Sequence, residues 1–392
     1  MKKQNKIWLI AILVLFAVGS VLLSVYRGKD SKAVHQDSVP AASITTTPED
    51  DPVQQLIDSM TLHEKICQMF IVHPENISGE SSVTAVGDEL QKALSSYPVG
   101  GFLLNTGNME SREQITKFIG DAQKQINIPL FIASDEEGGR VSRLMRTVGT
   151  TKIGAMLSYR EDGAETAEQN AKTIGQDMHE LGLNLNFAPV ADVFSNPENK
   201  VIGDRAYSTD FEEAAELVSA AVMGFHKGGV LCTLKHFPGH GNTAADSHDG
   251  TVYIDKSLNE LRKQELLPFR AGIDASADMV MLGHLTLPEL DDNPAPLSHR
   301  IVTDLLREEM GFEGVIITDS LQMQAITDHY SSAEISVKAV AAGVDMLLCP
   351  MDLAAAAEGL TEAVKNGTIS PQRIDESVYR ILTLKFKYGL IR

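Results

Sequence analysis

The residues best suited to chemistry lie between Lys235 and His248. The chain there runs Lys235-His-Phe-Pro-Gly-His-Gly241, and Asp246-Ser-His248 follows after a short spacer. In an extended loop residues two apart share a side, so the Asp246 carboxylate can orient the His248 imidazole and stabilise its charged form. Because histidine titrates near neutrality, it can both donate and accept a proton. The spacing predicts that Asp246 and His248 form an acid/base dyad.

An apolar run at 230–234 leads directly into this stretch and is typical of a buried strand. Seven similar runs occur along the chain, with helical patterns between them. The expected strands are 69–72, 99–104, 129–133, 184–189, 230–234, 279–282, 314–318 and 344–348. This alternation predicts an α/β fold, a (β/α)8 TIM-type barrel that forms one catalytic domain over residues 51–392. A doubly wound open sheet is the alternative, but no GxGxxG follows the first strand.

Several helices carry recognisable signals at their ends. Thr61 and Glu64 have the spacing of a capping box ahead of a short helix. An amphipathic helix is expected over 164–181, with Gly182 at the position after its C-cap. Residues 258–275 are expected to form one continuous helix.

Polar side chains follow the expected strands where a barrel places its active site. They are Asp135 and Arg143 after the third strand, Asp192 with Asp204 and Arg205 after the fourth, Lys235, His236, Asp246 and His248 after the fifth, His284 after the sixth and Asp319 after the seventh. Retaining glycoside hydrolysis requires a carboxylate nucleophile and a second group that acts as acid and then as base. Asp319 suits the nucleophile because it is short, ends a strand and has no basic neighbour in sequence.

Four motifs resemble glycoside hydrolase family 3, and most closely its single-domain bacterial β-N-acetylhexosaminidases (β-N-acetylglucosaminidases). They are 134–143 (SDEEGGRVSR), 201–205 (VIGDR), 235–248 with its Asp-Ser-His loop, and 316–323 (IITDSLQM). The resemblance implies that Asp319 forms the glycosyl-enzyme and that His248, paired with Asp246, is the acid/base. It implies that Asp135, Arg143, Arg205, Lys235 and His236 hold the sugar hydroxyls. In one small departure, Glu136 stands where glutamine is common.

The implied substrate is a terminal β-linked N-acetylglucosamine (GlcNAc), released with retention of configuration. Other family members take a glutamate acid/base from a second domain. We expect the Asp246–His248 loop to fill that role here. We expect no cofactor, no metal and a monomer. His240 is left without a catalytic role and is predicted to be structural.

The N-terminus has the pattern of a membrane segment. Lys2, Lys3 and Lys6 precede an apolar run over 7–25, long enough to cross a bilayer. We expect residues 1–27 to be a signal anchor, or a signal peptide if cleaved, and residues 28–50, rich in Ser, Thr, Pro and Ala, to be a disordered stalk. This predicts an extracytoplasmic enzyme on the cell membrane, acting on peptidoglycan fragments such as GlcNAc–MurNAc muropeptides.

The composition limits the classes of binding partner, and the sequence leaves several alternative functions open. The formal net charge of −19 argues against nucleic acid. Cys67, Cys232 and Cys349 each lie in an apolar run and are expected to be buried free thiols. A β-glucosidase or a phosphorolytic enzyme of the same family remains possible, as does a non-catalytic wall-binding module. A metal-dependent hydrolase would use His236, His240, Asp246 and His248 as ligands, but their spacing matches no known zinc motif.

Overall fold

The computed structural model describes residues 51–243, 250 and 252–391. The predicted anchor (1–27) and stalk (28–50) therefore lie outside the described residues, as do Asp246 and His248. Within the described ranges, no helix combines the length and apolar character needed to cross a membrane.

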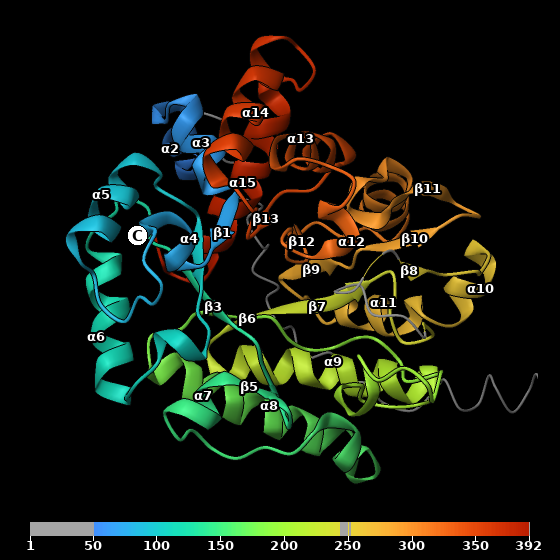
Figure 1. Cartoon of the computed structure of the whole chain (residues 1–392). Helices are drawn as coiled ribbons and strands as arrows, with labels where there is room; N and C mark the ends of the chain where they lie inside the picture. Colours follow the sequence, from blue (N-terminus) through green and yellow to red (C-terminus); the bar gives the residue numbers. More distant parts are fainter. Residues whose placement is uncertain (1–50, 244–249, 251, 392) are drawn as a thin grey trace, which may run out of the picture. The chain divides into compact units, whose positions relative to one another are not determined.

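The core of the domain is a parallel eight-stranded sheet that curves into a barrel (Figure 1). Its strands are β1 Phe70–Val72, β2 Gly101–Leu103, β3 Phe131–Ser134, β6 Leu185–Asn186, β7 Leu231–Phe237, β9 Met279–Leu282, β12 Val315–Thr318 and β13 Leu347–Leu348. Their order is β12-β9-β7-β6-β3-β2-β1-β13. A parallel bridge between Ile317 and Met346 joins the two ends of this sheet. The predicted barrel is confirmed, with every expected strand present but most of them shorter than expected.

The strands are buried on both faces, because the barrel interior covers one side and helices cover the other. The α-helices are α2 Pro52–Ser59, α3 Leu62–Gln68, α4 Pro74–Ser78, α5 Asp88–Ser96, α6 Arg112–Gln123, α7 Arg143–Thr147, α8 Gly163–Glu180, α9 Phe211–Gly228, α10 Leu258–Lys263, α11 Leu266–Asp274, α12 Gln324–Thr327, α13 Ser332–Ala342, α14 Leu353–Lys365 and α15 Pro371–Lys387. Short 3₁₀ helices span Thr106–Asn108, Met156–Asp162, Gly203–Arg205 and Ala295–Leu297, and a π-helix spans Arg300–Glu309.

The helix-end signals in the sequence act as predicted. The Thr61 side chain caps α3 by accepting the Glu64 N–H, and the Glu64 carboxylate accepts the Thr61 N–H. Helix α8 ends at Glu180 with Leu181 as its C-cap, and Gly182 follows with a φ of 93° that glycine adopts without strain. The Leu183 N–H donates to the Met178 carbonyl at 3.0 Å, which completes the hydrogen-bonding pattern of a Schellman motif.

The prediction of one continuous helix over 258–275 is wrong. The segment is divided into α10 and α11, and Gln264 between them has a non-helical backbone (φ −132°, ψ −99°). Pro268 explains the break, because its ring would clash with the carbonyl of residue 264 in a continuous α-helix.

Two small sheets were not predicted, and both lie beside the strand ends. Strands β4 (Glu136–Gly138) and β5 (Val141–Ser142) form a hairpin directly after β3. Strands β8 (Val252–Tyr253), β10 (Leu285–Leu287) and β11 (Asp291–Pro294) form a three-stranded sheet. Since β8 pairs with β10, the chain that follows the Asp246–His248 segment is tied to the segment that follows β9.

Candidate active site

Two acidic and two basic side chains form a network at the carboxyl ends of β3 and β7. Lys235 is buried near the end of β7, and its Nζ lies 2.7 Å from Asp135 Oδ1 and 2.7 Å from Glu137 Oε1. Glu137 also receives two hydrogen bonds of 2.8 Å from Arg205, through Nε and Nη2. The pKa of Glu137 is lowered although burial opposes ionisation, because the charges of Arg205 and Lys235 outweigh the desolvation.

Asp135 is the most accessible member of this network. Its side chain is 22% exposed, whereas Lys235 and Glu137 are 3% and 0% exposed. Arg143 Nη2 lies 4.0 Å from the second Asp135 oxygen, and Arg143 Nε has no hydrogen-bond acceptor within the described part of the chain. Asp135 and Arg143 can therefore meet a ligand while the buried Lys235 holds the Asp135 carboxylate through its other oxygen.

The first turn of α7 fixes the position of Arg143. The buried Glu136 carboxylate accepts the backbone N–H of Arg143 at 2.7 Å, of Leu144 at 2.9 Å and of Met145 at 3.4 Å. Burial raises the pKa of Glu136 to about 7, although these donors and the Arg143 charge act in the opposite direction.

His236 is held by the buried carboxylate of Asp192, which the sequence places at a strand end without indicating a role. Asp192 Oδ2 lies 2.6 Å from His236 Nδ1 and accepts the His236 N–H at 3.1 Å. The other oxygen accepts the His240 N–H at 2.6 Å. Nδ1 therefore carries a proton toward Asp192, which directs Nε2 away from that carboxylate. Asp192 thus sets the orientation of His236.

His240 is buried and hydrogen-bonded to its surroundings, and its structural role stays a prediction. Its Nδ1 lies 2.7 Å from Thr243 Oγ1, and its carbonyl accepts from Asn199 at 2.8 Å. Burial lowers the pKa of His240, against the opposing charge of Asp192. These contacts hold Thr243, the last described residue before the segment that carries Asp246 and His248.

Asp319 follows β12 directly and is half-buried on the same rim. One of its oxygens accepts the Ser320 N–H at 2.7 Å, and His284 Nε2 contacts the Ser320 carbonyl at 2.8 Å. Burial opposes ionisation, but the charges of His236, His284 and Lys235 and the Ser320 N–H together lower the pKa of Asp319. The carboxylate is therefore ionised at neutral pH, as a nucleophile must be.

The structure brings together Asp135, Arg143, Arg205, Lys235 and His236 and places Asp319 under the electrostatic influence of His236 and Lys235. Asp204 does not join them. Its carboxylate pairs with Arg140 at 2.8 Å, and both side chains are about half exposed.

These strand-end carboxylates and cations lie in a region that a known family model matches. The model described as the glycosyl hydrolase family 3 N terminal domain covers residues 61–384. The chain belongs to glycosyl hydrolase family 3.

Relatives in family 3 carry hexosaminidase names. The chain is 36% identical to "Beta-hexosaminidase A" of Pseudoalteromonas piscicida over 337 residues, which are 78% of this chain and 56% of that protein. It is 33% identical to "Beta-hexosaminidase LpqI" of Mycobacterium tuberculosis over 330 residues, 80% of this chain and 83% of that protein. The predicted likeness to the β-N-acetylhexosaminidases of family 3 is confirmed.

A solved family 3 structure supports the same assignment. It is a β-N-acetylglucosaminidase from Paenibacillus sp. str. FPU-7, with a TM-score of 0.79 and 36% identity. The match covers 85% of this chain and 63% of that one. The chain therefore spans less than two thirds of this structure and of the P. piscicida protein.

The sequence indicates no functional role for two residues of this site, Glu137 and Asp192. Glu137 sits inside the motif 134–143, but only the structure shows that it joins Arg205 to Lys235. Asp192 was noted at a strand end without a role, and its partner His236 is 44 residues away. For Asp192 the signal available was a charged residue after an otherwise apolar run, whereas Glu137 lies in the acidic run 135–137, where no pattern distinguishes it.

Proposed function

We propose that this chain is a retaining exo-β-N-acetylglucosaminidase. The observation that carries the proposal is the ionised Asp319 carboxylate on the same rim as the network of Asp135, Lys235 and Arg205. A neutral sugar needs many hydrogen bonds to fix it and a carboxylate near its anomeric carbon. This rim supplies both, and the hexosaminidase names of the relatives point to GlcNAc as the sugar.

The proposed reaction has two steps. Asp319 attacks the anomeric carbon while the His248 imidazolium, paired with Asp246, gives its proton to the departing glycosidic oxygen. A glycosyl ester on Asp319 and a neutral His248 result. His248 then removes a proton from water, which attacks the same carbon and releases the sugar with its original configuration.

The network of buried charges would prepare the site for this sugar. Lys235 and Arg143 approach Asp135 from different sides, so its carboxylate oxygens are oriented before a hydroxyl group binds. Preorganised groups do not have to rearrange during the reaction, which lowers the barrier. Arg205 and His236 would complete the set that holds the sugar.

We further propose that the enzyme acts outside the cytoplasmic membrane, on GlcNAc–MurNAc fragments of peptidoglycan. The apolar run at 7–25 and its basic flank support an N-terminal anchor, and residues 28–50 would act as a stalk. Fractionation of cells that express the full chain tests the location: recovery in the cytoplasm would contradict it.

Hydrolysis of chromogenic β-GlcNAc, β-glucose and β-xylose substrates by the full chain tests the proposed activity. We expect the wild type to prefer β-GlcNAc clearly, and we expect the Asp319→Ala variant to lose the hydrolytic activity. A preference for β-glucose would overturn the assignment of the sugar, and full turnover by the Asp319→Ala variant would overturn the mechanism.

Phosphorolysis is a second candidate, because a family 3 structure titled "Beta-glucoside phosphorylase BglX" matches this chain with a TM-score of 0.77 at 25% identity. Phosphate would then replace water in the second step. Product analysis with and without added phosphate separates the two: hydrolysis predicts free GlcNAc in both, and phosphorolysis predicts GlcNAc 1-phosphate when phosphate is present.

A further inference from the structure

A cluster of three metal-ligating side chains lies at the opposite end of the barrel from the active site. Among the described residues, His226, Cys232 and Asp278 are the one such group whose ligand atoms all lie within 4.8 Å of one another. His226 is in the last turn of α9, Cys232 is near the start of β7, and Asp278 immediately precedes β9. The cluster therefore joins one helix to the amino ends of two barrel strands.

The distances within the cluster are close to those around a tetrahedral metal ion. Cys232 Sγ lies 3.8 Å from His226 Nε2, and His226 Nε2 lies 2.8 Å from Asp278 Oδ2. Zinc bonds of ~2.3 Å to sulfur and ~2.0 Å to nitrogen or oxygen place such ligand atoms about 3.3–3.5 Å apart. Shifts of roughly half an ångström in the side chains would satisfy that geometry.

Asp278 has unused coordinating capacity. Its side chain is fully buried, and Oδ2 already accepts from the Cys232 N–H at 3.0 Å and the Tyr388 hydroxyl at 3.2 Å. Oδ1 accepts no hydrogen bond within the described part of the chain. Its nearest charged neighbour is Lys387 Nζ at 3.7 Å. A buried carboxylate oxygen with no donor is unusual and is a position where an ion can bind.

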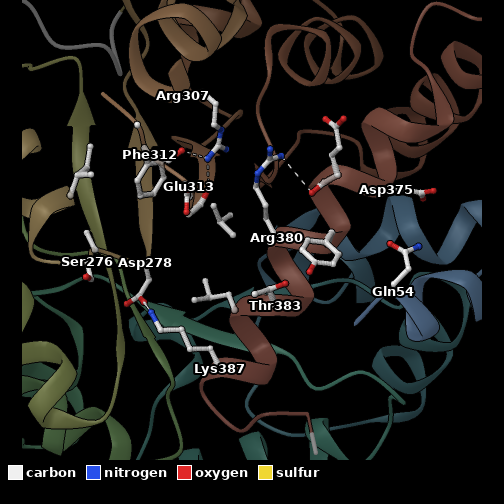
Figure 2. A pocket seen from close by; sticks show the side chains of 18 of the residues that line it. Gln54, Ser276, Asp278, Arg307, Phe312, Glu313, Asp375, Arg380, Thr383 and Lys387 are labelled. Carbon is white, nitrogen blue, oxygen red and sulfur yellow. Dashed lines mark hydrogen bonds and ion pairs between the residues drawn. The ribbon is translucent and has the colours of Figure 1, made fainter. Parts of the chain in front are cut away.

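The cluster borders a pocket on its Asp278 side. Asp278 and Lys387 line a pocket of about 1190 Å³ between the barrel base and α15, and Figure 2 shows Lys387 extending toward Asp278 from that helix. The Lys387 side chain is 57% exposed, and the His226 side chain is 25% exposed. Lys387 would therefore compete with a cation at Asp278 from the solvent side of the cluster.

We propose that His226, Cys232 and Asp278 form a structural site for a zinc-type divalent cation. A mixed nitrogen, sulfur and oxygen set suits this borderline-soft ion, and Tyr388 or water from the pocket would supply the fourth ligand. The ion would replace the thiol proton of Cys232, which leaves to solvent, so binding strengthens as the pH rises. At the base of the barrel the site would stabilise the fold and leave the sugar chemistry untouched.

Cobalt binding to the chelator-treated full-length protein tests this site. A cobalt–thiolate bond absorbs in the near ultraviolet, whereas histidine and carboxylate ligands do not produce that band. We expect the band in the wild type, its loss in Cys232→Ser, and its loss or marked weakening in His226→Gln, which changes a partly exposed side chain. Zinc should displace the cobalt and raise the melting temperature of the wild type but not that of Cys232→Ser.

Cys67→Ser is the matched control, because Cys67 is also buried and contacts a histidine, His63, at 3.5 Å but has no carboxylate in a comparable cluster. The band should persist in this variant. Absence of the band from the wild type, or its survival in Cys232→Ser, would overturn the proposed site. Hydrolysis of β-GlcNAc by the same preparations is a separate measurement, so failure here leaves the proposed function standing.

Discussion

Glu137 allows a quantitative test of how the active-site network is held together. Replacing it with glutamine keeps the side-chain shape but removes the negative charge between Arg205 and Lys235. Both cations are largely buried, with side chains 13% and 3% exposed, so water cannot replace the lost carboxylate. Removing one partner of a buried ion pair costs about 3–5 kcal/mol, and we expect Glu137→Gln to lose a similar free energy of unfolding.

Asp204→Asn is the control for this change. The Arg140–Asp204 pair bridges the same two chain segments, but its side chains are 45% and 52% exposed. Exposed ion pairs contribute about 0–1 kcal/mol to stability, so the free energy of unfolding of this variant should differ from that of the wild type by no more than about 1 kcal/mol.

Urea denaturation of both variants measures the difference between their free energies of unfolding. Hydrolysis of β-GlcNAc by the folded Glu137→Gln variant should be slower, because Lys235 and Arg205 lose their fixed orientation. The pKa of Glu137 is lowered in the folded state, so its stabilising contribution is present at neutral pH and declines as acid protonates it. Equal stability of the two variants, or wild-type activity in Glu137→Gln, would refute the argument.

Three further predictions concern other buried groups. Lys385 is fully buried beneath the barrel, where it donates to Gln68 Oε1 and the Gly100 carbonyl, and burial lowers its pKa to about 7. Above that pH the unfolded chain binds more protons than the folded chain, so the free energy of unfolding should rise by about 2 kcal/mol between about pH 7 and about pH 9. Urea titrations measure this rise, and Lys385→Met should abolish it. Glu136 has a pKa raised to about 7, so the folded state binds more protons and stability should fall as the pH rises from about 4.5 to about 7. Glu136→Gln should remove that fall, and an unchanged pH profile would contradict the assignment. Asp192→Asn should reduce kcat/KM on the order of 100-fold through misplacement of His236. It should also lower the melting temperature, because the asparagine NH2 would face one of the two backbone N–H groups that Asp192 accepts. Unaltered kinetics would exclude the orienting role.

The barrel could be predicted because its signals are local. Each strand is a short apolar run, and features such as Gly182 and the Thr61–Glu64 capping box act within one turn of helix. The apolar pattern of 258–275 is compatible with one helix, so it does not reveal the break at Gln264. The break arises because the Pro268 ring would clash with the carbonyl four residues earlier in a continuous helix.

The arrangement of the candidate active site could be predicted in part. Strand-end positions identified Asp135, Lys235 and Asp319 because parallel strands bring their carboxyl ends to one rim. The pairing of Glu137 with Arg205 joins residues 68 apart in the chain, and no sequence pattern specifies such a contact. The same holds for the basal cluster, where Cys232 was expected only to fill space and instead lies 3.8 Å from His226.

The central claim is that Asp319 forms the glycosyl-enzyme, and trapping that intermediate tests it most directly. A fluorinated β-GlcNAc derivative with a good leaving group slows turnover so that the ester accumulates, and peptide mass spectrometry then locates the sugar. We predict a stable adduct of one sugar per chain on Asp319, absent from Asp319→Ala. Labelling of a different residue, or rapid turnover of the Asp319→Ala variant without any adduct, would contradict the account.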